Sequence, residues 1–379
     1  RVWQGTLDQL RVRASQAGEW RQGKGAAISI AADKAGLESL CLASPEASSL
    51  CLSGSWTRPE QQWHLQAEMA TLPAGELAKF FGQPVPVEGT LDAEAHLQGS
   101  GSRLVQGRLT ASAANLKAHV TGADGAQQTL QWRRNALQAD YAQQRLQAEF
   151  ASELTDGSAL AATLTGSQLS LSPSNLRQVP LTGSLRFNLN TLTPLTALSK
   201  QSVRFSGQLQ GNFGFAGTVA APHFAGTLHL ANGQAEIPQL GITLKPVTLA
   251  VSGTDEIINL QATAQSGTGT LRAESRLALD QIANKGLTIK VTGDRFQAIA
   301  LQGLDVLVSP DLHVVLSPKS GTIGGTVTIP EAAIASVDLG NTVSSSGDVM
   351  VVDDEQASQA FASWPLFANV KLVAGDKVR

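Results

Sequence analysis

The chain has 379 residues, a formal net charge of −3 at pH 7 and only 16% charged residues. The near-neutral charge excludes the basic surface of a nucleic-acid-binding protein, and no apolar run approaches the roughly 18–20 residues of a membrane-spanning helix. The 36 glycines, with serine, threonine and glutamine at many polar positions, are typical of numerous short strands joined by turns.

The first informative element is a predicted hairpin that contains both cysteines. A turn centred on Glu46 places Cys41 opposite Cys51 and predicts a cross-strand disulfide, which implies an oxidising compartment. The same register pairs apolar residues on the other face: Leu40 with Leu52, and Leu42 with Leu50. The alternative is two reduced cysteines in a cytosolic chain. No further cysteine or histidine lies near enough in the sequence to predict a metal site here.

Two short helical inserts interrupt the strand pattern. One is predicted over residues 72–82, with Pro73 near its start and Gly82 at its end, and the other over residues 192–198. Each is followed by a stretch of the form V-x-[V/F]-x-G-x-L, beginning at Val85 and at Val203. The two stretches align without a gap at an offset of 118 residues (203 minus 85), which predicts a recurring structural unit.

The clearest alternation of apolar and polar residues runs from 203 to 244, and period two is typical of a strand with one apolar face. The rest of the chain resembles this stretch, so roughly two dozen strands are expected at ordinary strand lengths. We predict an all-β fold: an elongated, curled antiparallel sheet that forms a closed β-helix or an open trough, with an apolar interior and short helical inserts. Whether that interior is a dry core or an open groove is left undecided by the pattern.

The sequence shows no clear domain boundary. We predict one continuous trough over residues 1–379, with sub-units 1–70, 71–188 and 189–379, of which the last two open with a short helix. Polar residues dominate 353–360, which we interpret as a mobile loop.

Catalytic and metal-binding patterns are not evident. The six histidines form neither H-x-H nor H-E-x-x-H, and no G-x-S-x-G elbow with partner residues is found. The glycine-rich stretches at 99–101 and 266–270 are not followed by a predicted helix, which argues against a phosphate-binding loop. We therefore predict a protein without catalytic residues, metal or cofactor. An enzyme on a β-helix, such as a polysaccharide lyase, ranks third because no acid–base pair supports it.

Five short motifs follow one another in the second half of the chain. They are G-T-x-x-x-P-x-x-x-G from Gly217, N-G-x-x-x-x-P-x-x-G from Asn232, S-P-D-L from Ser309, G-x-V-x-I-P-E-A from Gly325 and S-x-D-V from Ser346. In these motifs the chain resembles the AsmA-like, TamB-type family of periplasmic proteins. The resemblance is specific over about 203–375 and looser over 1–200.

This resemblance implies a bent β-sheet trough, or β-taco, that bridges the inner and outer membranes and conducts phospholipids toward the outer membrane. It also implies an inner-membrane anchor at the amino-terminal side and a partnership with an outer-membrane assembly barrel, TamA, both through regions outside these residues. The alternative function is a scaffold for insertion or secretion of outer-membrane proteins, whose sheet edges recruit partners by strand addition.

The resemblance also turns the apolar face into a candidate lipid groove, in which acyl chains contact apolar side chains and head groups stay at the open seam. The predicted lining residues are Val203, Phe205, Leu209, Phe213, Phe215, Leu228, Leu230, Ile242, Leu244, Leu249, Val251, Leu260, Leu277, Leu279, Ile289 and Val291.

Overall fold

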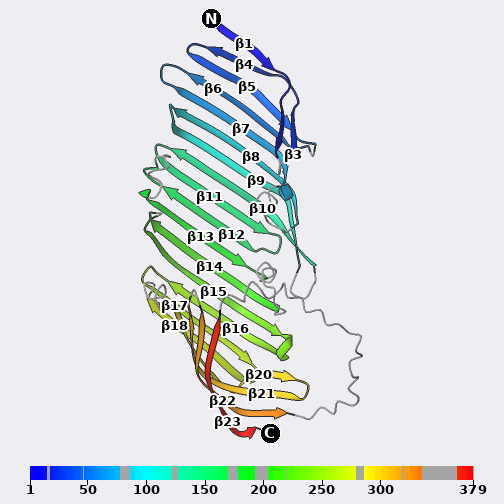
Figure 1. The fold of residues 1–379 in the computed structure, drawn as a ribbon, viewed down its shortest axis with the longest axis vertical. Coiled ribbons are helices and arrows are strands. Elements are labelled where there is room, and N and C mark those ends of the chain that lie inside the picture. Colours follow the sequence, from blue (N-terminus) through cyan, green and yellow to red (C-terminus); the bar gives the residue numbers. More distant parts are fainter. Residues whose placement is uncertain are drawn as a thin grey trace. The chain divides into compact units, whose positions relative to one another are not determined.

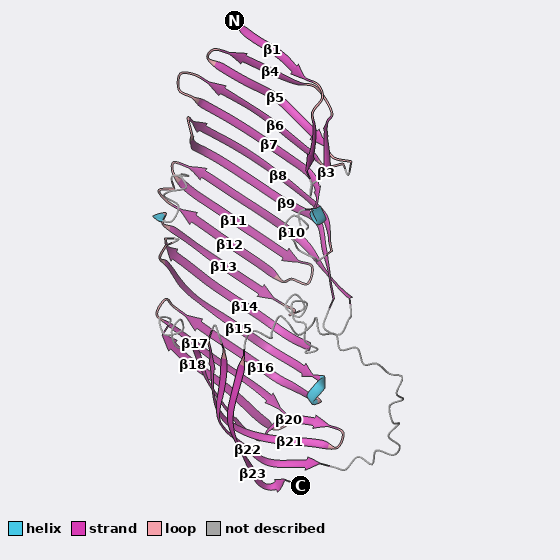
Figure 2. Ribbon diagram, in the orientation of Figure 1, coloured by secondary structure: helices cyan, strands magenta, loops and turns pink. Residues whose placement is uncertain are grey.

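The computed structural model confirms the all-β fold class (Figure 1). Its described residues form 23 strands and almost no helix (Figure 2). The described ranges are 1–14, 18–45, 47–76, 86–121, 127–169, 178–192, 204–218, 220–278, 286–317, 320–334 and 365–378.

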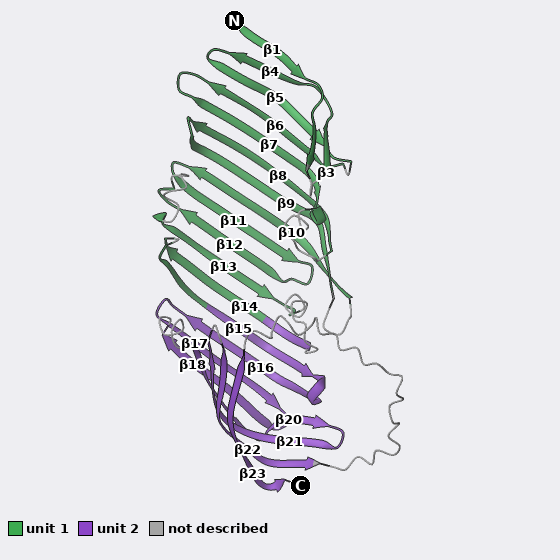
Figure 3. Cartoon of the chain, in the orientation of Figure 1, with its two compact units in different colours: residues 1–200, 209–226 green, residues 201–208, 227–379 purple. Residues whose placement is uncertain are grey.

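The chain forms two compact units (Figure 3). Unit 1 comprises residues 1–200 and 209–226, and unit 2 comprises residues 201–208 and 227–379. The continuous trough and its subdivision at residues 70 and 188 stay predictions.

Unit 1 is a long antiparallel meander. From β4 to β14 each strand pairs with the next one along the chain, while β1 pairs with β4 and the β2–β3 hairpin joins β5 through β3. The strands are β1 (Val2–Leu7), β2 (Arg11–Ala14), β3 (Gly18–Gln22), β4 (Ala26–Ala31), β5 (Lys34–Ala43), β6 (Ser49–Thr57), β7 (Gln62–Pro73), β8 (Val87–Ser100), β9 (Arg103–Thr121), β10 (Gln127–Ala142), β11 (Arg145–Leu154), β12 (Ala159–Gly166) and β13 (Leu181–Leu189). Two further strands, β14 (Arg204–Gly217) and β15 (Pro222–Ile237), contribute residues to both units.

Unit 2 is also built from antiparallel pairs, except that its last two strands run parallel. A short 3₁₀ helix, η2 (Pro238–Leu240), which the sequence pattern did not predict, precedes its meander. The strands are β16 (Ile242–Gly253), β17 (Ile257–Ser266), β18 (Gly269–Ala278), β19 (Leu287–Asp294), β20 (Phe296–Leu301), β21 (Leu304–Leu316), β22 (Gly321–Ile334) and β23 (Leu366–Val378).

A line of β-bulges crosses neighbouring strands of unit 1. Thr71 of β7, Gly89 of β8 and Asn115 of β9 all have positive φ, at 56°, 115° and 52°, and the pairing register shifts beside Thr71 and Gly89. The backbone N–H of Thr71, released from the ladder, donates instead to the Asp92 carboxylate at 2.9 Å. Bulges bend the strands that contain them and increase their twist, so this line is where the long strands fold.

The recurring V-x-[V/F]-x-G-x-L stretch has a structural counterpart. Gly207, which aligns with Gly89 in the sequence, also has a positive φ, at 139°, and Asn232 on β15 has a φ of 52° like Asn115 on β9. A Cβ at Gly207 would lie 2.9 Å from the Cα of Gly233. Both glycines therefore allow a bulged backbone to approach the next strand closely.

The cysteine hairpin adopts the predicted register. Cys41 of β5 lies opposite Cys51 of β6, and the two are joined as a disulfide across a sequence separation of 10. The flanking apolar pairs are also as predicted, with Leu40 opposite Leu52 and Leu42 opposite Leu50.

The helical inserts are described only in part. Leu72 and Pro73 pair with β8 as the end of β7, so helical backbone begins at Ala74 and not at Leu72; residues 74–76 are helical. Most of both inserts, at 77–82 and 193–198, lies outside the described residues, as does the predicted loop 353–360.

Replacing Gly89 by alanine is expected to destabilise unit 1 by about 2–4 kcal/mol. The positive φ strains the backbone of an alanine, and the overlap of its Cβ with neighbouring atoms adds to that cost. The new Cβ would lie 2.8 Å from the carbonyl oxygen of Ala114 and 2.9 Å from that of Asn115. The matched control is Gly214→Ala, where the nearest atoms lie 3.9 Å away. Urea unfolding followed by circular dichroism measures both; equal midpoints for the two variants would contradict this role of Gly89.

The disulfide is expected to stabilise the hairpin by about 2–3 kcal/mol through closure of a short loop. Thiol labelling of the unfolded chain should detect no free cysteine before reduction and both Cys41 and Cys51 after it. Labelling of both residues in unreduced protein from the periplasm would show that the bridge does not form there.

Candidate functional site

Cross-strand register aligns apolar side chains in two rows across unit 1. In each row every residue lies directly opposite the next, on one strand after another from β5 to β14. The first apolar row is Leu42, Leu50, Met69, Ala93, Ala111, Leu137, Phe150, Ala162, Leu185 and Phe213. The second apolar row is Leu40, Leu52, Ala67, Ala95, Leu109, Ala139, Ala148, Leu164, Gly183 and Phe215. We call the two rows together the apolar face of unit 1.

The opposite side of the same sheet is polar. Residues between the row members face this side because side chains alternate along a strand. Arg108 of β9 pairs with Asp140 of β10 at 2.6 Å, and Thr163 of β12 hydrogen-bonds Ser184 of β13 at 2.8 Å. Hydrogen bonds from Gln138 and Arg108 lower the pKa of Asp140 and keep its carboxylate ionised. This side therefore has the polar pairs expected of a sheet surface in water.

The apolar face is open to solvent along much of its length. Phe150, Phe213 and Leu109 are each 37% exposed, whereas a packed sandwich buries such side chains almost completely. Among the described strands of unit 1, the closest backbone contacts run between strands that are neighbours in the sheet. The apolar face is thus not the dry core of a closed β-helix.

The rows mix large and small side chains. In the first row, the small side chains of alanines 93, 111 and 162 lie among the larger ones of Met69, Leu137 and Phe150. A shallow hollow of about 670 Å³ follows these positions from β7 to β12. Toward β13 and β14, the ring of Phe215 lies directly over Gly183, and those of Phe187 and Phe213 stack with centroids 6.2 Å apart.

One end of the face is closed by a small core. Tyr141 of β10 is buried against Leu169 and Val179, which lie in the connection between β12 and β13. The Tyr141 hydroxyl donates to the carbonyl of Leu169 at 2.8 Å. Tyr141 is buried, whereas Phe150, nine residues along the chain, is 37% exposed. The open part of the face therefore lies beyond this small core.

Three predicted lining residues belong to unit 1. Leu209, Phe213 and Phe215 lie on β14, and the last two end the first and second apolar rows. Val203 and Leu279 lie outside the described residues.

Most of the remaining predicted residues share one face in unit 2. Pairing places Leu249 opposite Ala262 and Val251 opposite Leu260, and continues through β18 to β19 and β21. Leu277, Ile289 and Val291 lie on the same face as these leucines by that register.

Two groups of predicted residues are placed by their burial alone. Leu228 and Leu230 are half-buried between exposed neighbours on β15. At the start of β16, Ile242 is buried and Leu244 half-buried, again between exposed neighbours. Phe205 is 45% exposed, so it is no core residue. Lipid contact at all these positions stays a proposal.

The sequence interpretation missed the apolar rows before residue 203. Met69, Leu109, Leu137 and Phe150 were not singled out because alanine fills many of the positions between them and weakens the alternation. The sequence did contain one signal for these rows. The leucines of the Cys41–Cys51 hairpin begin both rows, so pairing this hairpin with the strands that follow it would have extended them.

No cluster of three or more histidine, cysteine or carboxylate side chains suited to a metal ion is found in the described ranges. Nor does any helix in this part of the chain have the length and apolarity needed to cross a membrane.

Comparison with protein-family models identifies the chain. The model of the TamB N-terminal domain matches residues 1–230, and that of the TamB C-terminal domain matches residues 254–379. The chain belongs to the TamB family. No solved structure matches it.

Membership of the TamB family confirms the resemblance seen in the motifs from Gly217 onward and extends it over the first 200 residues. It gives the chain a TamB-type role in outer-membrane assembly or lipid transport, in a family that spans the periplasm and serves as a non-enzymatic module.

If the apolar face is open, it should tolerate a charge. We expect Phe150→Arg to cost less than about 2 kcal/mol, against more than about 4 kcal/mol for a charge placed in a closed core. Gln147→Arg, exposed on the polar side of the same strand, is the control with the same change of charge. Urea midpoints measure both, and unfolding of Phe150→Arg alone would show a closed interior.

Proposed function

We propose that this TamB-family chain carries phospholipids between the inner and outer membranes, with their acyl chains lying on the apolar faces. The main support is the apolar face of unit 1, where two rows of apolar residues cross ten strands and Leu109, Phe150 and Phe213 are each 37% exposed. An exposed apolar surface of this extent indicates a binding site.

Acyl chains suit this surface physically. Each methylene group removed from water contributes roughly 0.8 kcal/mol, and the contact is non-directional, so a chain can shift along the rows. A phosphate-containing head group stays in water because its burial without partners is costly. Binding distributed over many similar positions along the rows favours movement over retention.

The location and partner follow as parts of the same proposal. The Cys41–Cys51 disulfide supports an oxidising compartment, which for this family is the periplasm. We place the inner-membrane anchor and the contact with the outer-membrane barrel TamA in regions outside residues 1–379. A scaffold for outer-membrane protein insertion is the competing function, and it requires no lipid on the apolar face.

Arginine at Leu249 or at Leu260 should reduce bound phospholipid and its transfer between vesicles severalfold while the fold persists, because the charge interrupts the apolar surface. Native mass spectrometry of the purified chain and transfer of a fluorescent phospholipid measure the two effects. Asn259→Arg, exposed on the opposite side of β17, is the control and should behave like the unmodified chain.

Two outcomes would contradict the proposal. Unchanged transfer by both leucine variants would favour the scaffold function. Unfolding of Leu260→Arg would show that a closed core, and no conduit, exists at that position.

A further inference from the structure

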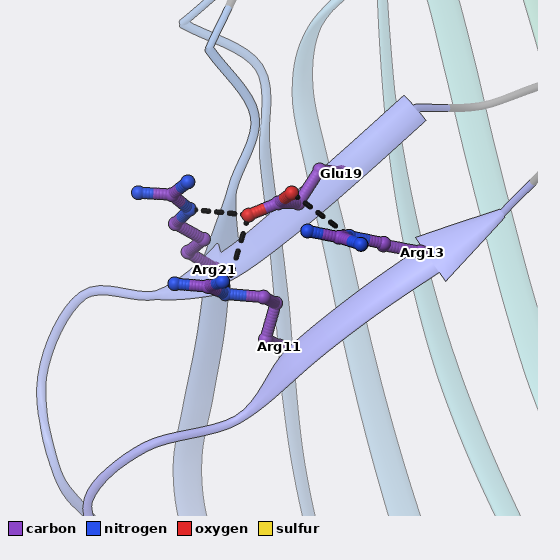
Figure 4. A network of polar contacts seen from close by, with 4 residues as sticks. All are labelled: Arg11, Arg13, Glu19 and Arg21. Carbon is purple, nitrogen blue, oxygen red and sulfur yellow. Dashed lines mark hydrogen bonds and ion pairs between the residues drawn. The ribbon is translucent and has the colours of Figure 1, made fainter.

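A charged cluster on the β2–β3 hairpin lies on the polar side of the sheet. Its three arginines all contact the carboxylate of Glu19, at 3.2, 3.0 and 2.6 Å respectively: Arg11, Arg13 and Arg21 (Figure 4). Arg21 pairs with Ala43 of β5, the neighbour of Leu42 in the first apolar row, so alternation turns Arg21 away from that row. Arg13 lies directly opposite Glu19 as a cross-strand ion pair. These charges are typical of a water-facing surface.

Two neutral polar residues lie instead on the same side of the sheet as the apolar rows. Asn135 of β10 is directly opposite Ser152 of β11, and two residues along these strands Leu137 is opposite Phe150 of the first apolar row. Because side chains alternate along a strand, all four lie on one face. Ser152 pairs in turn with Leu160 of β12. The polar pair therefore has apolar neighbours both along the strands and across them.

The hydrogen bonding of this pair is incomplete. Ser152 is only 8% exposed, and its hydroxyl donates to Oδ1 of Asn135 at 2.7 Å. The Nδ2 atom of Asn135 is shielded from solvent and meets no acceptor among the described residues. A shielded donor without an acceptor destabilises a fold, whereas two apolar side chains at these positions would not. The pair is thus not optimised for stability, and a ligand that supplies an acceptor would complete its hydrogen bonding.

The pair lies near one margin of the apolar face. Beyond Ser152, β11 ends at Leu154, and the turn at 155–157 is exposed. Ser152 is three residues from this turn, a distance of about 10 Å along a strand. In the other direction Phe150 and Ala148 belong to the first and second apolar rows. The polar pair therefore lies between a water-exposed turn and the apolar rows.

A phospholipid has its groups in the same order. Its charged head group favours water, its acyl chains favour apolar surface, and its ester carbonyls lie between them and accept hydrogen bonds. One neutral amide donor suits a carbonyl oxygen, because burying a phosphate charge against that donor alone would be costly. Asn135 as a whole is half-buried, and the terminal torsion of an asparagine is broad, so its amide can turn the donor toward a ligand on the face.

We propose that Asn135, positioned by Ser152, donates a hydrogen bond to an ester carbonyl of a phospholipid whose acyl chains lie on the apolar rows. This inference rests on the proposed function and adds to it a site for the junction between head group and acyl chain. An ether-linked lipid has no carbonyl at that junction, so the site favours ester-linked lipids.

The test is competition between two lipids that differ only in this linkage. The full chain is equilibrated with equal amounts of a diacyl phosphatidylglycerol and its dialkyl ether analogue with the same chain lengths, and the bound lipids are quantified by mass spectrometry. We expect about a fivefold preference for the ester lipid, the effect of one neutral hydrogen bond. In Asn135→Leu/Ser152→Ala the preference should disappear while the total lipid bound changes little.

The variant and its control are matched in chemistry. Asn135→Leu/Ser152→Ala replaces both hydrogen-bonding partners by apolar groups, so it should fold at least as stably as the unmodified chain. Gln147→Leu removes an amide from an exposed position on the polar side of β11 and should keep the full preference. Circular dichroism and urea midpoints establish that each variant is folded.

The outcomes separate this inference from the function on which it rests. If the unmodified chain binds neither lipid, the proposed function fails. If it binds both lipids equally, the ester site is overturned while the apolar face remains the lipid site, and this result depends on no variant. If the preference exists but persists in Asn135→Leu/Ser152→Ala, the carbonyl is recognised elsewhere and the assignment to Asn135 is overturned.

Discussion

Strand register is the constraint on which the rest of this structure depends. Side chains alternate with period two, so a strand that slipped by one residue would turn its apolar side chains to the polar face. From β5 to β14 every strand keeps the register that places an apolar residue opposite the next one, from Leu42 through Leu137 to Phe213. Because large side chains of these rows remain 37% exposed, register builds a continuous apolar surface that is open to solvent.

The bulge line gives that surface its curvature. Thr71, Gly89 and Asn115 interrupt three adjacent strands at neighbouring positions, and each needs a backbone conformation that glycine and asparagine adopt most readily. The same combination at Gly207 and Asn232 indicates that the device is used twice in the chain.

Local patterns in the sequence predicted the features that depend on few residues. The Cys41–Cys51 hairpin was predicted to the residue, since a short turn determines its register. Alternation predicted the fold class and the common face of Leu249 and Leu260. The bulges could not be located in advance, because only the partner strand reveals which residue is extra.

Features that join distant residues were missed for the same reason. The first apolar row draws single residues from ten strands, and several of them are alanines that show no preference for an interior by themselves. The arginine cluster requires β2 and β3 to pair before Arg11, Arg13 and Arg21 meet at Glu19. In the sequence these four residues are ordinary charges of two short strands.

The central claim is that lipid occupies the apolar face and not the polar one. Photo-crosslinking in cells tests it directly, with a photoreactive amino acid placed at Phe150 or Leu249 on apolar faces and at Gln147 or Asn259 on the sides opposite. The account predicts phospholipid adducts, identified by mass spectrometry, from Phe150 and Leu249 only. Adducts from all four positions alike, or no lipid adduct from either apolar position, would contradict it.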